Sequence, residues 1–175
     1  MTGIEIAGKS YEPREIVEQA KKARGWFAAI AAFSFVNSVL IMFGVEVHFV
    51  IGLGATQVVD AIVAVTREQG GPSAAAVVGV IGLLMNLCII GVVMFIWWAS
   101  GRGSTAAYVV GMVLYGLDGL IFLAVGDWIG VGFHVFFLFM LWGGLRFMRE
   151  WRKAEASLSQ AAPGPQPETY VTPMT

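Results

Sequence analysis

YVVGMVLYGLDGLIFLAVGDWIGVGFHVFFLFMLWGGLRFMR, residues 108–149, is the stretch that decides the fold. It contains two apolar runs separated by Gly126-Asp127-Trp128, which predicts two helices joined by a tight turn. One acidic or basic residue lies near the middle of each run, Asp118 in the first and His134 in the second. Each is eight residues from Gly126. In an antiparallel hairpin both therefore lie about 12 Å below the turn, at ~1.5 Å per residue. We expect the two side chains to meet, directly or through one water or hydroxyl.

The composition of the chain is that of an integral membrane protein. Of its 175 residues, 57% are hydrophobic and 13% are charged. A soluble domain has about half apolar and about a quarter charged residues. The formal net charge of −1 gives no indication of nucleic-acid binding. The single cysteine, Cys88, excludes an intrachain disulfide and a paired-cysteine zinc or redox site.

Four apolar segments are long enough to cross a bilayer, which needs about 20 residues per helix. We place these spans at residues 25–44, 75–98, 105–125 and 128–147. The predicted fold class is therefore an all-α integral membrane protein, a bundle of four transmembrane helices.

An additional helix is expected between the first two spans, at about residues 49–67. On a helical wheel its polar side holds Thr56, Gln57, Asp60 and Arg67, and its apolar side holds Ile51, Val58, Ile62 and Val65. This amphipathic pattern is typical of an interfacial or re-entrant helix rather than of a span. We expect the polar side to face water, and we expect the helix to lie near the outer interface.

The distribution of basic residues predicts the topology. With four spans, ten of the 11 Lys and Arg residues fall on the side of the two termini, and only Arg67 falls on the other side. A fifth span at residues 49–66 would divide them six to five. The positive-inside rule thus favours four spans in a plasma-type cytoplasmic membrane, with both termini in the cytoplasm. The expected domains are a cytoplasmic amphipathic segment (1–24), the transmembrane domain (25–153) and a disordered, proline-containing cytoplasmic tail (154–175).

This topology brings four polar residues, one from each span, to similar depths in the outer half of the membrane. The candidate polar or ion-binding layer consists of Asn37, Asn86, Asp118 and His134, with Tyr115 beside it. A possible lid over the layer consists of Glu46, His48, Gln57 and Asp60. The simplest interpretation is that these side chains hydrogen-bond across helices. For the ionisable pair a functional role is an equal alternative, since such residues are costly inside a membrane.

Sharper hypotheses for the pair need more than the sequence contains. Asp118 and His134 can exchange a proton, or bind a divalent metal with His48 or Asp60. With Ser38 they provide the residue types of a nucleophilic triad, and haem between His48 and His134 is a weaker idea. The chain has no H-x-x-x-H spacing and no G-x-S-x-G elbow. We therefore assign no catalytic, cofactor-binding or metal residue and expect no cofactor.

Two classes of function remain open, with a third behind them. We narrowly favour an accessory or scaffold protein that packs through glycine-rich helix faces, as a homo-oligomer or within a larger membrane complex. The alternative is a small proton- or ion-coupled transporter that uses Asp118 and His134. An intramembrane enzyme is third. A solvent-connected cavity reaching Asp118 would favour transport, and dry packing around it would favour a scaffold.

Overall fold

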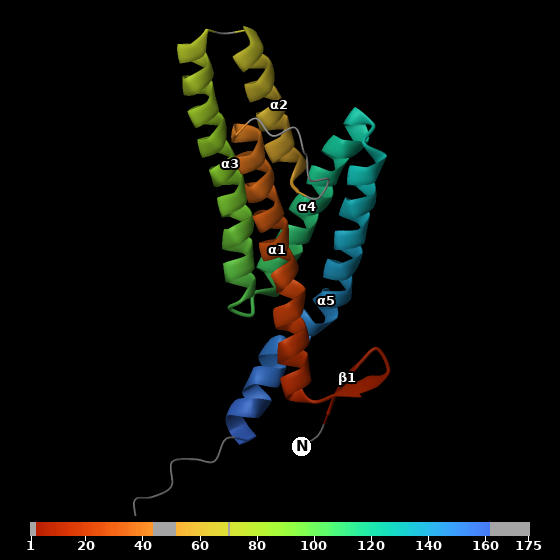
Figure 1. The fold of residues 1–175 in the computed structure, drawn as a ribbon. Coiled ribbons are helices and arrows are strands. Elements are labelled where there is room, and N and C mark those ends of the chain that lie inside the picture. The colour runs from red at the N-terminus through yellow and green to blue at the C-terminus, as the bar shows by residue number, and fades with distance from the viewer. Residues whose placement is uncertain (1–2, 44–51, 70, 162–175) are drawn as a thin grey trace, which may run out of the picture.

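The computed structural model describes residues 3–43, 52–69 and 71–161 of the chain, and Figure 1 shows its fold. In chain order the elements are β1 (Ile4–Ile6), β2 (Lys9–Tyr11), α1 (Pro13–Met42), α2 (Gly54–Gln69), α3 (Pro72–Ser100), α4 (Thr105–Val125) and α5 (Trp128–Ala161). Within the described ranges, α1, α3, α4 and α5 are the four helices long and apolar enough to cross a membrane. The prediction of a largely helical chain with four helices long and apolar enough to span a membrane is confirmed.

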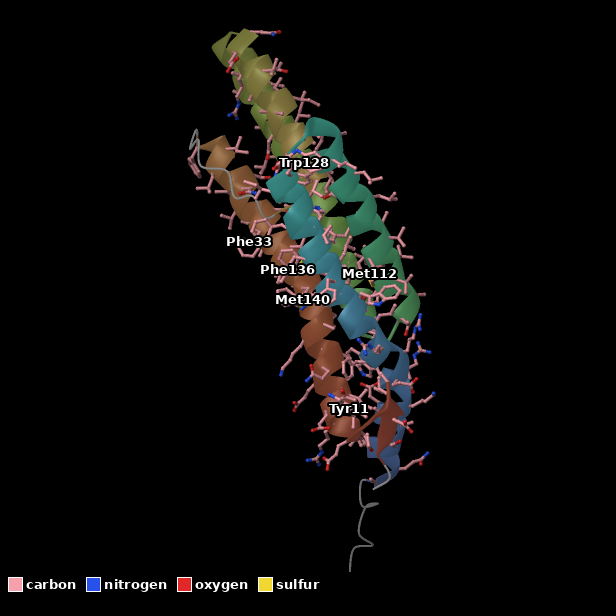
Figure 2. All side chains as sticks on the ribbon, turned by 90° about the vertical axis from the view of Figure 1, so that its right-hand side faces the viewer. Tyr11, Phe33, Met112, Trp128, Phe136 and Met140 are labelled. Atoms are coloured by element: carbon pink, nitrogen blue, oxygen red, sulfur yellow. The ribbon has the colours of Figure 1, made fainter. Side chains whose placement is uncertain are left out.

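The longest helices, α1 and α5, pack against each other along the bundle, and both are longer than the predicted spans (Figures 1 and 2). α1 begins at Pro13 with a capping box, in which the Glu15 carboxylate accepts the Glu12 amide at 3.0 Å. It then continues without a break through the segment predicted to precede the membrane. The two helices approach closely where Gly144 of α5 lies against Ala23 of α1, because a methyl group on Gly144 would overlap Ala23.

The predicted start of the tail, at residue 154, is wrong. α5 continues to Ala161, because Met148, Trp151 and Ala154 extend its buried stripe beyond the last predicted span. Residues 162–175, the rest of the predicted tail, lie outside the described residues.

The N-terminal residues form a β-hairpin that the sequence pattern did not predict. β1 and β2 pair antiparallel, with Ile6 opposite Lys9. The connecting residues Ala7 and Gly8 both have positive φ, 51° and 77°, as a tight hairpin turn requires. Tyr11 packs edge-on against Phe147 of α5, with ring centroids 5.4 Å apart, and Figure 2 shows Tyr11 beside that helix. The hairpin therefore covers α5 at the end of the bundle opposite the α2–α3 connection (Figure 1).

α4 and α5 form the predicted helical hairpin, with the turn where it was expected. Gly126 ends α4 with φ 75°, a conformation that glycine adopts without strain. The Asp127 side chain then accepts the amides of Ile129 and Gly130 at 3.1 and 3.0 Å, which caps the start of α5. The turn places Asp118 and His134 on facing helices.

α2 lies antiparallel to α3, as Figure 1 shows. Its last turn lies where α3 begins, with the Arg67 guanidinium against Gly79. About two turns earlier, Asp60 of α2 contacts Asn86 of α3. The first turn of α2 reaches α4, because the amide of Gly54 bonds to Asp118. α2 therefore extends from the level of the Asp118–His134 pair to the start of α3.

The two sides of α2 face opposite to the sequence prediction. Val58, Ile62 and Val65 are 41%, 60% and 52% exposed on the outer surface, whereas Thr56 and Asp60 are buried. The expectation that the polar side faces water is wrong for these two residues. The physical reason is that α1 and α3 present polar side chains to this side, so hydrogen bonds form within the bundle.

Candidate functional site

Asp118 and His134 are in direct contact, which confirms the prediction that these side chains meet. His134 Nε2 lies 3.0 Å from Asp118 Oδ2, and both residues are buried. The imidazole is held in place by neighbouring rings. Tyr115 stacks on it with ring centroids 4.4 Å apart at 16°, and Phe122 lies 4.7 Å away. Gly119 leaves room for the ring, because a methyl group there would lie 3.1 Å from it.

Both nitrogens of the His134 ring face oxygen acceptors. Nε2 contacts the Asp118 carboxylate, and Nδ1 lies 3.0 Å from the carbonyl oxygen of Gly130. Both ring nitrogens of His134 therefore have a hydrogen-bond partner within the fold, as buried polar groups require.

The Asp118 carboxylate also caps the first turn of α2. Its Oδ2 accepts the amide of Gly54 at 2.7 Å, and its Oδ1 accepts the amide of Ala55 at 2.9 Å. The N-terminal amides of a helix lack partners within the helix and attract negative charge. The residue before Gly54 is Leu53, which cannot cap, so a carboxylate from another helix takes this role. The absence of a local cap was the one sequence signal for this contact.

Polar residues of α1 satisfy the non-helical backbone that leads into α2. The hydroxyl of Ser34 accepts the amide of Leu53 at 2.8 Å. The hydroxyl of Thr56, in α2 itself, donates to the carbonyl oxygen of Leu53 at 2.8 Å. Asn37 is buried and lies against Gly52, since a methyl group there would be 3.0 Å from its amide nitrogen. Asn37 and Ser34 of α1 thus contact residues 52 and 53, which lead into α2.

A second polar cluster joins α1, α2 and α3. Asn86 Nδ2 donates to Asp60 Oδ1 at 2.6 Å and to the Ser38 hydroxyl at 2.9 Å, and Ser38 lies 3.4 Å from Asp60 Oδ2. All three residues are buried. The predicted layer is therefore divided. Asn86 bonds to Asp60, which was predicted to lie in a lid, and not to the Asp118–His134 pair.

The remaining candidate residues are placed as follows. Gln57 is half-buried and lines a hollow of about 320 Å³ beside Asp60. Glu46 and His48 lie outside the described residues, so the structure does not test the haem hypothesis or the metal hypothesis in its form with His48. Across the described ranges, no group of three His, Cys, Asp or Glu residues is close enough to hold a metal ion. Ser38 bonds to Asp60 and Asn86 and not to His134, so Ser38, His134 and Asp118 do not form the hydrogen-bonded chain of a nucleophilic triad.

An apolar cavity of about 280 Å³ lies among α1, α3, α4 and the start of α2, and it reaches Asp118. Asp118 and Tyr115 are the two polar residues of its lining, which consists of Phe27, Leu53, Ala55, Ile89, Val92, Val93, Ile96, Gly111, Leu114, Tyr115 and Asp118. The sequence analysis did not predict this cavity. Lipid-facing and cavity-facing positions of a membrane helix are both apolar, so the pattern does not separate them.

No protein-family model, no curated protein and no solved structure matches the chain. The chemistry of the site therefore follows from its groups alone. The Asp118–His134 pair has the residue types for proton exchange, but its hydrogen bonds are made within the fold. The apolar cavity and the Tyr115 side chain are the parts that can contact another molecule.

Proposed function

We propose that the chain is a small membrane protein of the accessory or scaffold class, in which the Asp118–His134 pair holds a re-entrant helix. The observation that carries the proposal is the set of partners of Asp118. Its carboxylate accepts the Gly54 and Ala55 amides and the imidazole of His134. These donors occupy three of the about four lone-pair positions of the carboxylate, so most of its hydrogen-bonding capacity is used within the fold.

The re-entrant assignment of α2 rests on its length and on its surroundings. Its 16 residues extend about 24 Å, which is short of a hydrocarbon core of about 30 Å. Its first turn lies beside Asp118, seven residues before Val125 at the end of α4. Non-helical backbone at membrane depth is stable only where protein buries it. Ser34 and Asp118 supply the hydrogen bonds that this condition requires.

The proposed orientation places both termini in the cytoplasm of a plasma-type membrane. Ten of the 11 Lys and Arg residues fall on the side of the termini, which by the positive-inside rule is the cytoplasmic side. Exposed tryptophans near both ends of the spans agree with an interfacial position. Trp128 is 72% exposed at the start of α5, where Figure 2 shows it, and Trp98 is 44% exposed near the end of α3. The Arg102 guanidinium lies 3.7 Å from the Trp98 ring centroid, as suits the cytoplasmic interface.

The proposed partner, a second copy or a larger membrane complex, would pack on an outward helix face. Gly132 of α5 supports this because a methyl group there would meet nothing within 4 Å. It lies in a shallow apolar hollow with Ile129, Phe133 and Phe136, and Figure 2 shows Phe136 on this side of α5. Exposed small residues let a second membrane helix approach closely.

Cross-linking in native membranes tests the scaffold proposal. In a Cys88→Ala background, Gly132→Cys is expected to give one discrete cross-linked species. Leu120→Cys, on the exposed face of α4, is the control and should not. Equal cross-linking at both positions, or none at either, would contradict packing through this face of α5.

Proton- or ion-coupled transport is the second candidate, and one observation favours it. The hollow beside Gln57 and Asp60 approaches the polar residues from one side, and the apolar cavity reaches Asp118 from another. Proteoliposomes containing a pH-sensitive dye and given a pH gradient separate the candidates. The scaffold proposal expects equal flux for the wild type and for Asp118→Asn. Flux that is present in the wild type and lost in a folded Asp118→Asn variant would favour transport.

A further inference from the structure

The apolar cavity among α1, α3, α4 and the start of α2 has the size and lining of a ligand site. At about 30 Å³ for each water-sized group, its volume of about 280 Å³ has room for roughly nine such groups. Its lining is apolar except at Tyr115 and Asp118. Protein interiors are otherwise closely packed, and a void forfeits the contacts of the atoms around it. An apolar occupant would restore these contacts.

The mouth of the cavity opens to the side of the bundle, between α3 and α4. Val92 of α3 and Leu114 of α4 line the cavity and are also 52% and 45% exposed, so they form its rim. Val92 lies eight residues before Ser100, and Leu114 lies nine residues after Thr105. These positions are about 12 and 13 Å from the helix ends at ~1.5 Å per residue. In a bilayer the rim therefore faces hydrocarbon, and a ligand enters from the lipid.

The polar end of the cavity carries a free hydrogen-bond donor. Tyr115 is 4% exposed and lines the cavity, and no hydrogen bond to its hydroxyl is found in the part of the chain that the structure describes. Its ring cannot easily turn away, because it stacks on His134 and packs edge-on against Phe137, with ring centroids 6.3 Å apart. A hydroxyl without a partner in apolar surroundings is unfavourable. A ligand with a hydrogen-bond acceptor would relieve this.

The lining beside this donor selects the type of acceptor. The described residues that line the cavity include no Lys, Arg or His, and Asp118 lies one turn from Tyr115 on the same face of α4. A carboxylate or phosphate group on the ligand would therefore be buried without a positive partner, whereas a neutral carbonyl oxygen needs none. We propose that the cavity binds a lipid-soluble molecule in which a neutral carbonyl group, carried on an apolar chain, accepts the hydrogen bond of Tyr115. This site is additional to the scaffold role and does not depend on it.

Photolabelling of the full chain in liposomes tests the site. The probe is a long-chain fatty-acid methyl ester with a diazirine in its chain, and labelled peptides are mapped by mass spectrometry. Labels are expected on residues 89–96 of α3 and 111–118 of α4. Leu114→Trp places an indole at the mouth and should reduce this labelling about tenfold or more, since ligand contact with the cavity is lost. Leu117→Trp is the matched control, because Leu117 is 56% exposed on the same helix and does not line the cavity.

Tyr115→Phe tests the carbonyl. It removes the hydroxyl and keeps the ring that stacks on His134, so the fold should be retained, and circular dichroism checks this. One lost hydrogen bond should weaken probe binding by about 3- to 10-fold. Two competitors separate the sources of the carbonyl. Decylubiquinone competes if the site takes a quinone, and methyl palmitate competes if it takes an acyl ester.

Three results would overturn the proposal. Equal labelling of Leu114→Trp and Leu117→Trp would mean that the cavity is not the site. Unchanged probe binding in Tyr115→Phe would refute the proposal that a ligand carbonyl accepts a hydrogen bond from Tyr115. If ionised palmitate competes and neither neutral compound does, the proposal that the site takes a neutral carbonyl group is refuted.

Discussion

Replacing Asp118 with Asn should loosen the bundle at the start of α2 while preserving the size of the side chain. The carboxylate accepts three donors, at 2.7, 2.9 and 3.0 Å. The Asn side chain has only one oxygen, and its NH₂ group faces one or more of these donors. Loss of a hydrogen bond to a charged group costs about 1.5–3 kcal/mol, and an unpaired buried N–H costs about 1–3 kcal/mol more. We therefore expect the free energy of unfolding to fall by about 3–5 kcal/mol, the range for a broken buried pair.

His134→Gln should cost less, because Asp118 keeps the two amides of α2. We expect a loss of about 1.5–3 kcal/mol, for one hydrogen bond to a charged group. Both single variants remove the same ion pair. The double variant should therefore lose less than the sum, with a coupling energy of at least about 1 kcal/mol.

Reversible unfolding in mixed micelles, titrated with sodium dodecyl sulfate and followed by circular dichroism, measures these losses. Hydrogen exchange then locates them. The amides of Gly54 and Ala55 should exchange much faster in Asp118→Asn than in His134→Gln. Additivity within about 0.5 kcal/mol would refute the coupling. Unchanged exchange at these two amides would refute the role of Asp118 as the cap of α2.

Three further predictions concern topology, helix packing and α2. In a Cys88-free variant, cysteines at positions 70 and 102 should react with impermeant maleimides from opposite sides of the membrane, and reaction from one side would contradict four spans. Gly144→Ala should destabilise by about 1–3 kcal/mol, because the new methyl overlaps α1. Gly143→Ala is its matched control and should change stability by less than about 0.5 kcal/mol, because nothing lies near that position. Equal unfolding curves would contradict the close approach of α1 and α5. Spin labels along α2 should show oxygen accessibility with a period near 3.6 residues; a smooth gradient along the helix would indicate that it crosses the membrane.

The features that the sequence predicted are those that depend on local pattern. Helix length and apolar content predicted the four long helices, and the rise per residue from Gly126 predicted that Asp118 and His134 would meet. Tyr115, one turn from Asp118, was placed beside the pair and stacks on the imidazole. The binding of a proton or an ion by these residues stays a prediction.

The features that the sequence did not predict depend on contacts between distant segments. The cap on Gly54 comes from a carboxylate 64 residues later, and no local rule selects that partner. Asp60 was expected in water because an amphipathic helix at the membrane interface turns its polar side to water. In lipid the apolar side faces outward instead, and Asp60 turns inward to Asn86. The β-hairpin was missed because three-residue strands give too little alternation to recognise.

The cap on α2 also has a consequence for the synthesis of the protein. The amides of Gly54 and Ala55 leave the ribosome before Asp118, which lies 64 residues after Gly54. At about 5–20 residues per second, this separation corresponds to roughly 3–13 s of translation. During that interval the insertion machinery handles a helix whose cap has not yet been made. A nascent chain that ends before residue 118 should therefore leave the amides of Gly54 and Ala55 without this cap, although the partners of α2 on α1 and α3 are already present.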